Sequence, residues 1–276
     1  MRAALVQLTS TRDIDDNLKR CSELAAQAME TDADWLLFPE NAPFLGRDIE
    51  KLSVAESLDG EMVNHFRRMA RELGVWITLG SFPEISPDPQ RTYNTQVHLD
   101  PTGAIVDVYR KIHLFDVSID DTVDFCESDS VHPGADVVST RVGDDSHPVG
   151  MTICYDLRFP ELYRALQTKS VEAITVPSAF TRSTGNAHWH ALLRARAIEN
   201  QAYILAPNQW GHHFGNRYSY GQSAIYDPWG RCVGCASDGE RFVVAELDFD
   251  YVCEIRRSMP VLSHRRVNLT IDIDDQ

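Results

Sequence analysis

The stretch Val149–Glu161, VGMTICYDLRFPE, runs from an apolar strand through a turn into a helix that Pro160 opens. Cys154 falls at the junction, where a side chain projects towards backbone N–H groups and the positive end of a helix. Both features favour a thiolate, so the segment resembles a nucleophile elbow. A buried strand thiol without a catalytic role is the alternative interpretation for a single cysteine.

Apolar runs of strand length recur on both sides of this segment and alternate with helical patterns. The expected strands are Ala3–Leu8, Trp35–Phe38, Val75–Gly80, Thr95–Leu99, Ile105–Tyr109, Val149–Cys154, Ala173–Val176, Tyr203–Ala206, Ser223–Tyr226 and Phe242–Leu247. The expected helices are Asp15–Glu30, Glu61–Leu73, Pro160–Gln167 and His188–Asn200. Turn signals such as DPTG at 100–103 indicate hairpins, and Pro83–Pro89 predicts a surface loop between strands. The pattern predicts a layered α/β protein with a mixed sheet.

Composition narrows the class of protein further. The 276 residues are 43% hydrophobic and 24% charged, which is typical of one globular domain over 1–276 with a peripheral tail from about residue 270. A net charge of −15 disfavours nucleic acid and anionic membranes as partners. No apolar run approaches the ~20 residues of a membrane helix. Six irregularly spaced cysteines favour reduced thiols, and we expect a soluble cytoplasmic protein.

Two charged residues follow other expected strands. Glu40 comes directly after WLLFP at 35–39, and Lys111 comes two residues after Ile105–Tyr109. The carboxyl ends of strands in α/β sheets form the ligand crevice, so a carboxylate, an ammonium group and the Cys154 thiol can converge there. Taken singly, Glu40 or Lys111 would be interpreted as an exposed surface residue without a catalytic role. The spacing alone leaves open whether they are surface residues or form a shared site with Cys154.

The segments FPEN at 38–41, YRKIHL at 109–114 and ICYDLRFPE at 153–161 resemble, in this order, the three signatures of the carbon–nitrogen hydrolase (nitrilase) superfamily. The similarity extends from about Arg2 to Leu269 and is greatest to the Nit branch of deaminated glutathione amidases and ω-amidases. It implies a four-layer αββα sandwich and a homodimer, with the helix His188–Asn200 in part of the contact. It also implies hydrolysis of a small carboxamide, either deaminated glutathione or a related ω-amide of a dicarboxylic or keto acid, to a carboxylate and ammonia.

Amide hydrolysis by a thiol needs a base, a stabiliser of the tetrahedral oxyanion and an acid for the departing nitrogen. We expect Cys154 to form a thioester, Glu40 to act as base and then as acid, and Lys111 with the backbone N–H of Tyr155 to stabilise the oxyanion. This scheme requires no metal and no cofactor. The resemblance places a second glutamate, Glu127, beside Lys111, whereas the residues alone would make it an acidic loop residue.

Substrate recognition is expected close to the nucleophile. Arg158 lies four residues after it, where a guanidinium can pair with a substrate carboxylate through two parallel hydrogen bonds. The resemblance places Phe180 and Thr184 in the same cavity. An internal salt bridge from Arg158 to Glu161 or Asp156 is the alternative.

Other motifs favour structural roles. His188 is more consistent with a structural histidine than with a catalytic partner of the cysteine. Cys232 and Cys235 lack the second pair of ligands that a zinc site requires. The adjacent residues His212 and His213 are predicted to lie in a flexible loop. Two functional alternatives remain at this point. One is an N-carbamoyl amide hydrolase or nitrilase with the same three catalytic residues, and the other is a non-catalytic scaffold of the same fold.

Overall fold

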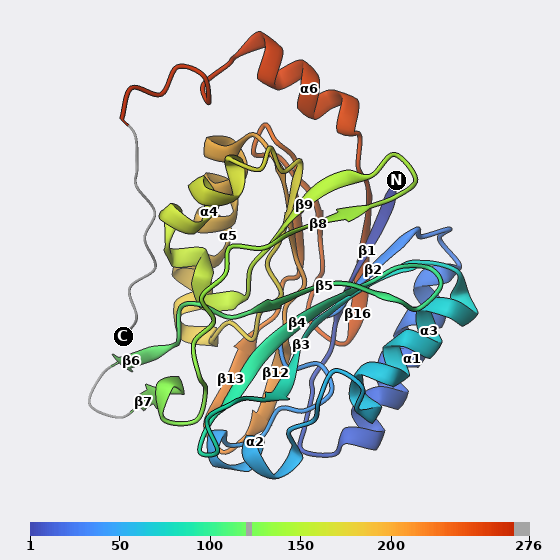
Figure 1. Ribbon diagram of the computed structural model, residues 1–276, viewed down its shortest axis with the longest axis vertical. Helices are drawn as coiled ribbons and strands as arrows, with labels where there is room; N and C mark the ends of the chain where they lie inside the picture. Colours follow the sequence, from blue (N-terminus) through green and yellow to red (C-terminus); the bar gives the residue numbers. More distant parts are fainter. Residues whose placement is uncertain (120–122, 268–276) are drawn as a thin grey trace.

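The computed structural model describes residues 1–119 and 123–267. The tail expected from about residue 270 lies outside the described residues. Two six-stranded sheets form the centre of the molecule, and helices cover their outer faces (Figure 1). This arrangement confirms the predicted four-layer αββα sandwich.

The first sheet has the order β16-β1-β2-β3-β4-β5, and α1 and α3 pack on its outer face. Its elements are β16 (Arg241–Glu246), β1 (Arg2–Gln7), β2 (Trp35–Leu37), β3 (Trp76–Ile85), β4 (Thr92–Leu99), β5 (Ile105–Arg110), α1 (Ile14–Met29) and α3 (Glu61–Leu73). Strands β1, β2 and β3 run parallel, and β4, β5 and β16 pair antiparallel. The sheet is therefore mixed, as the turn signals predicted.

The second sheet has the order β15-β14-β11-β10-β9-β8, and α4 and α5 cover it. Its elements are β15 (Cys232–Cys235), β14 (Ala224–Tyr226), β11 (Tyr203–Ala206), β10 (Ala173–Thr175), β9 (His147–Met151), β8 (Ser139–Val142), α4 (Pro160–Gln167) and α5 (Arg182–Asn200). Two hairpins and two further helices complete the described fold: β6 (Asp116–Ile119) with β7 (Val123–Cys126), β12 (Trp210–Phe214) with β13 (Arg217–Tyr220), α2 (Asp48–Val54) and α6 (Phe249–Ser258).

The alternation of side chains along β1 explains the layers. Ala4 and Val6 point to the core shared with α1 and α3, whereas Ala3 and Leu5 point to the core between the two sheets. Because both faces of the strand are covered, it reads as a continuous apolar run rather than an alternating one. Each sheet thus contributes one face to a helix-covered core and one to the core between the sheets.

Several predicted boundaries differ from the structure by one to six residues, among them those of α5, β3 and β9. Helix α5 begins at Arg182, six residues before the predicted start, so His188 lies inside it. Strand β3 continues through Pro83 to Ile85, and only the rest of the expected Pro83–Pro89 loop is non-strand. Pro83 is tolerated there because pairing with β2 ends at Thr78, and the Pro83 carbonyl bonds to Glu56 on the side away from β4, so the proline nitrogen also faces away from β4 and no ladder hydrogen bond is lost. Strand β9 ends at Met151 rather than Cys154, for a reason given below.

Candidate active site

Cys154 lies at a sharp turn between β9 and α4. It begins a short 3₁₀ turn, Cys154–Arg158, and its backbone has φ +48°, the left-handed region that a cysteine seldom adopts. The turn is held because the backbone N–H of Ile153 donates to Asp156 Oδ2 over 2.8 Å and that of Cys154 donates to the Pro177 carbonyl over 2.9 Å. These bonds end the strand early and direct the thiol into a cavity.

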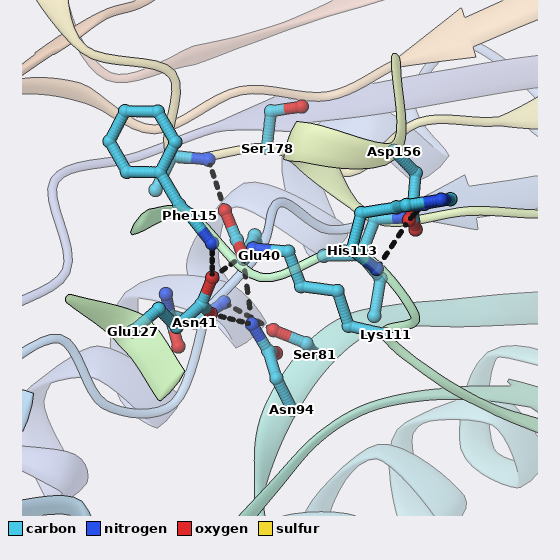
Figure 2. A network of polar contacts seen from close by, with 12 residues as sticks. Glu40, Asn41, Ser81, Asn94, Lys111, His113, Phe115, Glu127, Asp156 and Ser178 are labelled. Carbon is cyan, nitrogen blue, oxygen red and sulfur yellow. Dashed lines mark hydrogen bonds and ion pairs between the residues drawn. The ribbon is translucent and has the colours of Figure 1, made fainter. Parts of the chain in front are cut away.

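Asp156 connects this turn to the chain segment that carries Lys111. Its fully buried carboxylate accepts the Tyr109 hydroxyl over 2.7 Å and the His113 backbone N–H over 3.1 Å. The His113 ring nitrogen Nδ1 lies 2.7 Å from the same carboxylate, as Figure 2 shows. A buried carboxylate with this many partners is a rigid clamp between two loops that are 43 residues apart.

A buried ion cluster lies next to the thiol. Lys111 Nζ donates to Glu40 Oε1 over 3.0 Å and to Glu127 Oε2 over 2.8 Å. The exposed fractions of the three residues are 2%, 3% and 7%. The structure therefore brings Glu40, Lys111, Glu127 and Cys154 into one site from four separate parts of the chain. Figure 2 shows the first three of these residues.

The Asn94 side chain donates hydrogen bonds to both carboxylates of this cluster, and the sequence did not predict this residue as part of the site. Its side-chain nitrogen donates to Glu40 Oε1 over 2.9 Å and to Glu127 Oε1 over 3.2 Å (Figure 2). Backbone N–H groups supply the remaining donors, Ala179 to Glu40 and Phe115 to Glu127, each over 2.8 Å. The only signal for Asn94 in the sequence is an amide within a strand, which does not distinguish a site residue from an ordinary strand polar residue.

Lys111 and Glu127 both remain ionised in this cluster. Burial acts to lower the pKa of Lys111, but the Glu127 and Glu40 carboxylates outweigh it and hold that pKa well above its ordinary value. Burial acts to raise the pKa of Glu127, but Lys111, helped by Lys51, lowers it to about 2. Lys111 is thus a permanent cation and Glu127 a permanent anion at neutral pH.

The Cys154 thiol contradicts one expectation from the sequence. We expected the turn to favour a thiolate, yet burial and the nearby Glu40 carboxylate raise the pKa of the thiol, and Lys111 offsets this only in part. The resting group is a neutral thiol that shares the cavity wall with the Glu40 carboxylate. Such a pair can ionise the sulfur by proton transfer to Glu40 at the moment of attack.

A cavity of about 330 Å³ opens onto these groups. Its wall includes Glu40, Lys111, Glu127, Cys154, Tyr155, Phe180 and Thr184. Phe180 and Thr184 lie where the resemblance placed them. No backbone or side-chain acceptor within residues 1–119 and 123–267 takes the backbone N–H of Tyr155, so this donor is available to a ligand.

Arg158 lies outside the cavity wall. Its guanidinium carbon is 5.2 Å from the Phe180 ring centroid and 5.9 Å from that of Tyr155, and Nη1 lies 3.3 Å from His188 Nδ1. Within the described part of the chain it forms neither of the alternative salt bridges, to Glu161 or to Asp156. Its guanidinium group lies over the Phe180 ring and is not part of the cavity wall.

The described residues offer neither a metal site nor a membrane-spanning helix. Among residues 1–119 and 123–267, no group of three or more His, Cys, Asp or Glu side chains has an arrangement that could hold a metal ion. Cys232 and Cys235 lie in β15, as exposed thiols of an edge strand. In the same described residues, the helices are all too short or too polar to cross a bilayer.

Comparison with known proteins identifies relatives over nearly the whole chain. The carbon–nitrogen hydrolase family model matches residues 2–257. The human deaminated glutathione amidase is 43% identical over 273 residues, which is 96% of this chain and 82% of that protein. The structure of Nit3 from Saccharomyces cerevisiae, described as a member of branch 10 of the nitrilase superfamily, superposes with a TM-score of 0.87 at 30% identity and covers 97% of both chains.

A bacterial amidase extends the comparison to chemistry. The enzyme from Nesterenkonia is 25% identical, superposes with a TM-score of 0.77 and covers 95% of this chain and 98% of that one. In that structure acrylamide has added to the active-site cysteine. The two solved structures share their overall architecture with this chain, and the human and Nesterenkonia relatives are described as amidases.

Proposed function

Because this chain belongs to the carbon–nitrogen hydrolase family and is an amidase, we propose that it cleaves deaminated glutathione or a related ω-amide of a dicarboxylic or keto acid. The observation that carries this proposal is the buried Glu40–Lys111–Glu127 cluster beside a strained Cys154. A scaffold protein has no use for three buried charges, because buried ion pairs recover their desolvation cost poorly. The similarity to deaminated glutathione amidases is the reason for proposing this substrate.

The reaction proceeds in two halves. Glu40 accepts the thiol proton as Cys154 Sγ attacks the amide carbonyl, and the negative oxygen that forms is stabilised by Lys111 and the Tyr155 backbone N–H. The carbon–nitrogen bond then breaks as Glu40 returns its proton to the nitrogen, which leaves a thioester. Glu40 next deprotonates a water that attacks the thioester, the carboxylate product departs, and the sulfur regains a proton.

Glu127 does not need to exchange a proton in this scheme. With its pKa near 2 it stays ionised, holds Lys111 and accepts the Phe115 backbone N–H. Its role is to keep the ammonium group aimed at the oxyanion position. The Glu127 carboxylate also helps to raise the pKa of Lys111, so Lys111 keeps its proton beside Glu40.

The leaving group depends on the substrate. A primary ω-amide releases ammonia, whereas the amide nitrogen of deaminated glutathione carries the cysteinylglycine dipeptide and leaves as its amine. A cavity of about 330 Å³ is within the size range of small-molecule sites. Its wall includes Asp48 of α2, whose side chain is 46% exposed, so a leaving peptide can extend outward there.

Substrate profiling tests this proposal. The purified protein is incubated with α-ketoglutaramate, deaminated glutathione, an N-carbamoyl amino acid and a nitrile, and both ammonia and new amine are measured. We expect turnover of the first two and its complete loss in Cys154→Ala. Turnover of the last two alone would instead identify the N-carbamoyl hydrolase or nitrilase alternative and overturn the proposal.

We also propose that the chain forms a homodimer in a reducing compartment, the cytoplasm. Two large apolar side chains near the C-terminal end of α5 support the dimer: Ile198 is 45% exposed and Trp229 is 49% exposed. All six cysteines are unpaired thiols, which favours a reducing compartment. Sedimentation of Ile198→Glu against the unmodified protein tests the first proposal, and a monomeric unmodified protein would refute it.

A further inference from the structure

Two of the six cysteines lie on one short strand that the amidase reaction does not use. Strand β15 forms the edge of the second sheet and contains both Cys232 and Cys235. Both residues are exposed, and both are free thiols. Cys126 and Cys253 are exposed as well, but each is the single cysteine of its own strand or helix. A pair of thiols differs chemically from a single one, because two neighbouring thiols can close a disulfide.

An irregularity in the strand pairing places both cysteines on one face of the sheet. Residues three apart in a regular strand point to opposite faces. In β15, however, Cys232 pairs with Tyr226 and Cys235 pairs with Ala224, so Val233 is the extra residue of a β-bulge. Tyr226 and Ala224 are two residues apart in β14 and therefore point to the same face. Their cross-strand partners share that face, which brings the two thiols to the same side.

The separation of the two cysteines suits a disulfide. Two positions along a strand correspond to about 6.6 Å between Cα atoms. Disulfide-bonded cysteines usually have Cα atoms about 4.4–6.8 Å apart. Closing a disulfide from Cys232 to Cys235 thus requires little movement of the backbone. Because β15 lies at the edge of its sheet, that movement disturbs the ladder on one side only.

The surroundings of the pair favour a single thiolate. The Tyr226 hydroxyl, next to Cys232 in the ladder, lies 2.9 Å from His190 Nδ1, and the Arg194 guanidinium carbon lies 5.8 Å from the Tyr226 ring centroid. Hydrogen bonding with Cys235 lowers the pKa of Cys232 to about 6, burial opposes this, and His190 adds to the lowering. The same hydrogen bond raises the pKa of Cys235. The pair therefore shares one negative charge at neutral pH.

The catalytic thiol is in the opposite situation. Cys154 is buried at the wall of the cavity, and burial raises its pKa. Cys232 is exposed on another part of the surface and does not line that cavity. A thiol reagent in solution therefore meets an ionised sulfur at Cys232 and a protonated one at Cys154.

We propose that Cys232 and Cys235 form a reversible dithiol–disulfide site that reacts with low-molecular-weight disulfides such as oxidised glutathione. The Cys232 thiolate attacks one sulfur of the disulfide, forms a mixed disulfide and releases one thiolate. Cys235 then loses its proton, and its sulfur attacks Cys232 Sγ, which releases the second thiolate and closes the internal disulfide. The two cysteines lose two electrons, and the small disulfide becomes two thiols with the protons that the cysteines release. Excess thiol reverses both steps. This inference goes beyond the amidase reaction and does not depend on its substrate.

Peptide mapping tests the proposal directly. Trypsin cleavage after Arg231 and Arg241 yields the peptide 232–241, which contains both cysteines and no other. The reduced full-length protein is incubated with oxidised glutathione at pH 7, its remaining thiols are blocked with N-ethylmaleimide, and the peptides are weighed without reduction. We expect this peptide to lose two hydrogen atoms, to take up no maleimide, and to regain both thiols in dithiothreitol. The proposal is overturned if the peptide keeps both thiols, or if glutathione attaches first to Cys126 or Cys253.

Single variants assign the two roles at pH 6. About half of Cys232 is ionised there against about 0.3% of an ordinary thiol, and lower nucleophilicity offsets about 10-fold of this advantage. Cys235→Ser should therefore accumulate the mixed disulfide on Cys232, about 10-fold faster than Cys232→Ser acquires one on Cys235. Cys253→Ser is the matched control and should leave the rate at the pair unchanged. Equal rates in the two single variants would refute the assigned roles.

Amidase activity separates this site from the catalytic one. Reduced Cys232→Ser and Cys235→Ser should hydrolyse amides within about 2-fold of the unmodified protein, because neither cysteine lines the cavity. A larger loss in either variant with unchanged urea unfolding would place the pair in catalysis and overturn a separate site. If none of the candidate amides is hydrolysed, the proposed substrate fails, while the peptide masses still decide whether the dithiol site exists.

Discussion

Replacing Lys111 by methionine should destabilise the protein by about 3–5 kcal/mol at neutral pH, because it leaves two buried carboxylates without their counter-ion. The ammonium group lies 3.0 Å from Glu40 and 2.8 Å from Glu127 in a site that is almost closed to water. The pKa of Glu127 gives an independent magnitude. A shift from 4.5 to about 2 corresponds to about 3 kcal/mol of folding free energy.

The pH dependence of this loss follows from the sign of the shift. In the unmodified protein the pKa of Glu127 is lowered, so its stabilising contribution is complete above its ordinary pKa and disappears as the pH falls towards 2. Without Lys111, burial raises the pKa of Glu127, and Lys111→Met becomes less stable as the pH rises through that higher value. The stability difference should therefore be largest near pH 8 and smaller near pH 5.

The assay is urea unfolding of Lys111→Met and of the unmodified protein at both pH values, with amidase activity measured in parallel. Loss of an oxyanion donor should lower kcat by about 10²–10³-fold. Lys19→Met is the matched control, since that ammonium group is 72% exposed and lies 3.8 Å from Glu23. Equal stability of Lys111→Met and the unmodified protein at pH 8, or a difference that grows on acidification, would refute the electrostatic reasoning.

Three further substitutions test the rest of the site. Glu40→Gln should move the pH profile of Cys154 alkylation by iodoacetamide to lower pH, since the carboxylate raises the pKa of that thiol, and an unchanged profile would exclude their contact. Asn94→Ala should lower kcat by about 10-fold or more while KM changes little, because it removes one donor from each glutamate, and a change in KM alone would indicate a binding role instead. Asp156→Asn should lower the free energy of unfolding by about 2–4 kcal/mol in urea titrations, and full stability would show that the clamp between the two loops is dispensable.

The elements were predictable where local pattern decides them. Helix α3 coincides with its predicted range, because a 3.6-residue apolar repeat ends at Gly74 in the left-handed conformation. Helix α5 begins six residues earlier than predicted, since the segment from Arg182 contains a glycine and polar residues whose helical state depends on packing. Gly185 fits there because the Tyr220 side chain leaves no room for a larger residue. Local propensity could not reveal that contact.

Local patterns along the chain are enough to identify the fold class and the residue types of the catalytic chemistry. Ordered motifs place a carboxylate, an ammonium group and a thiol after apolar strands, and strand ends converge in α/β folds whatever the details of the loops. Chain order is enough for that inference.

The protonation states of these groups, and which arginines line the cavity, depend on contacts between distant parts of the chain. Asn94 joins the two glutamates, burial keeps the Cys154 thiol protonated, and Arg217 rather than Arg158 lines the cavity. These properties are set by folding because pKa values and side-chain access depend on desolvation and on neighbours brought together across long sequence separations. No local stretch of the sequence encodes those neighbours.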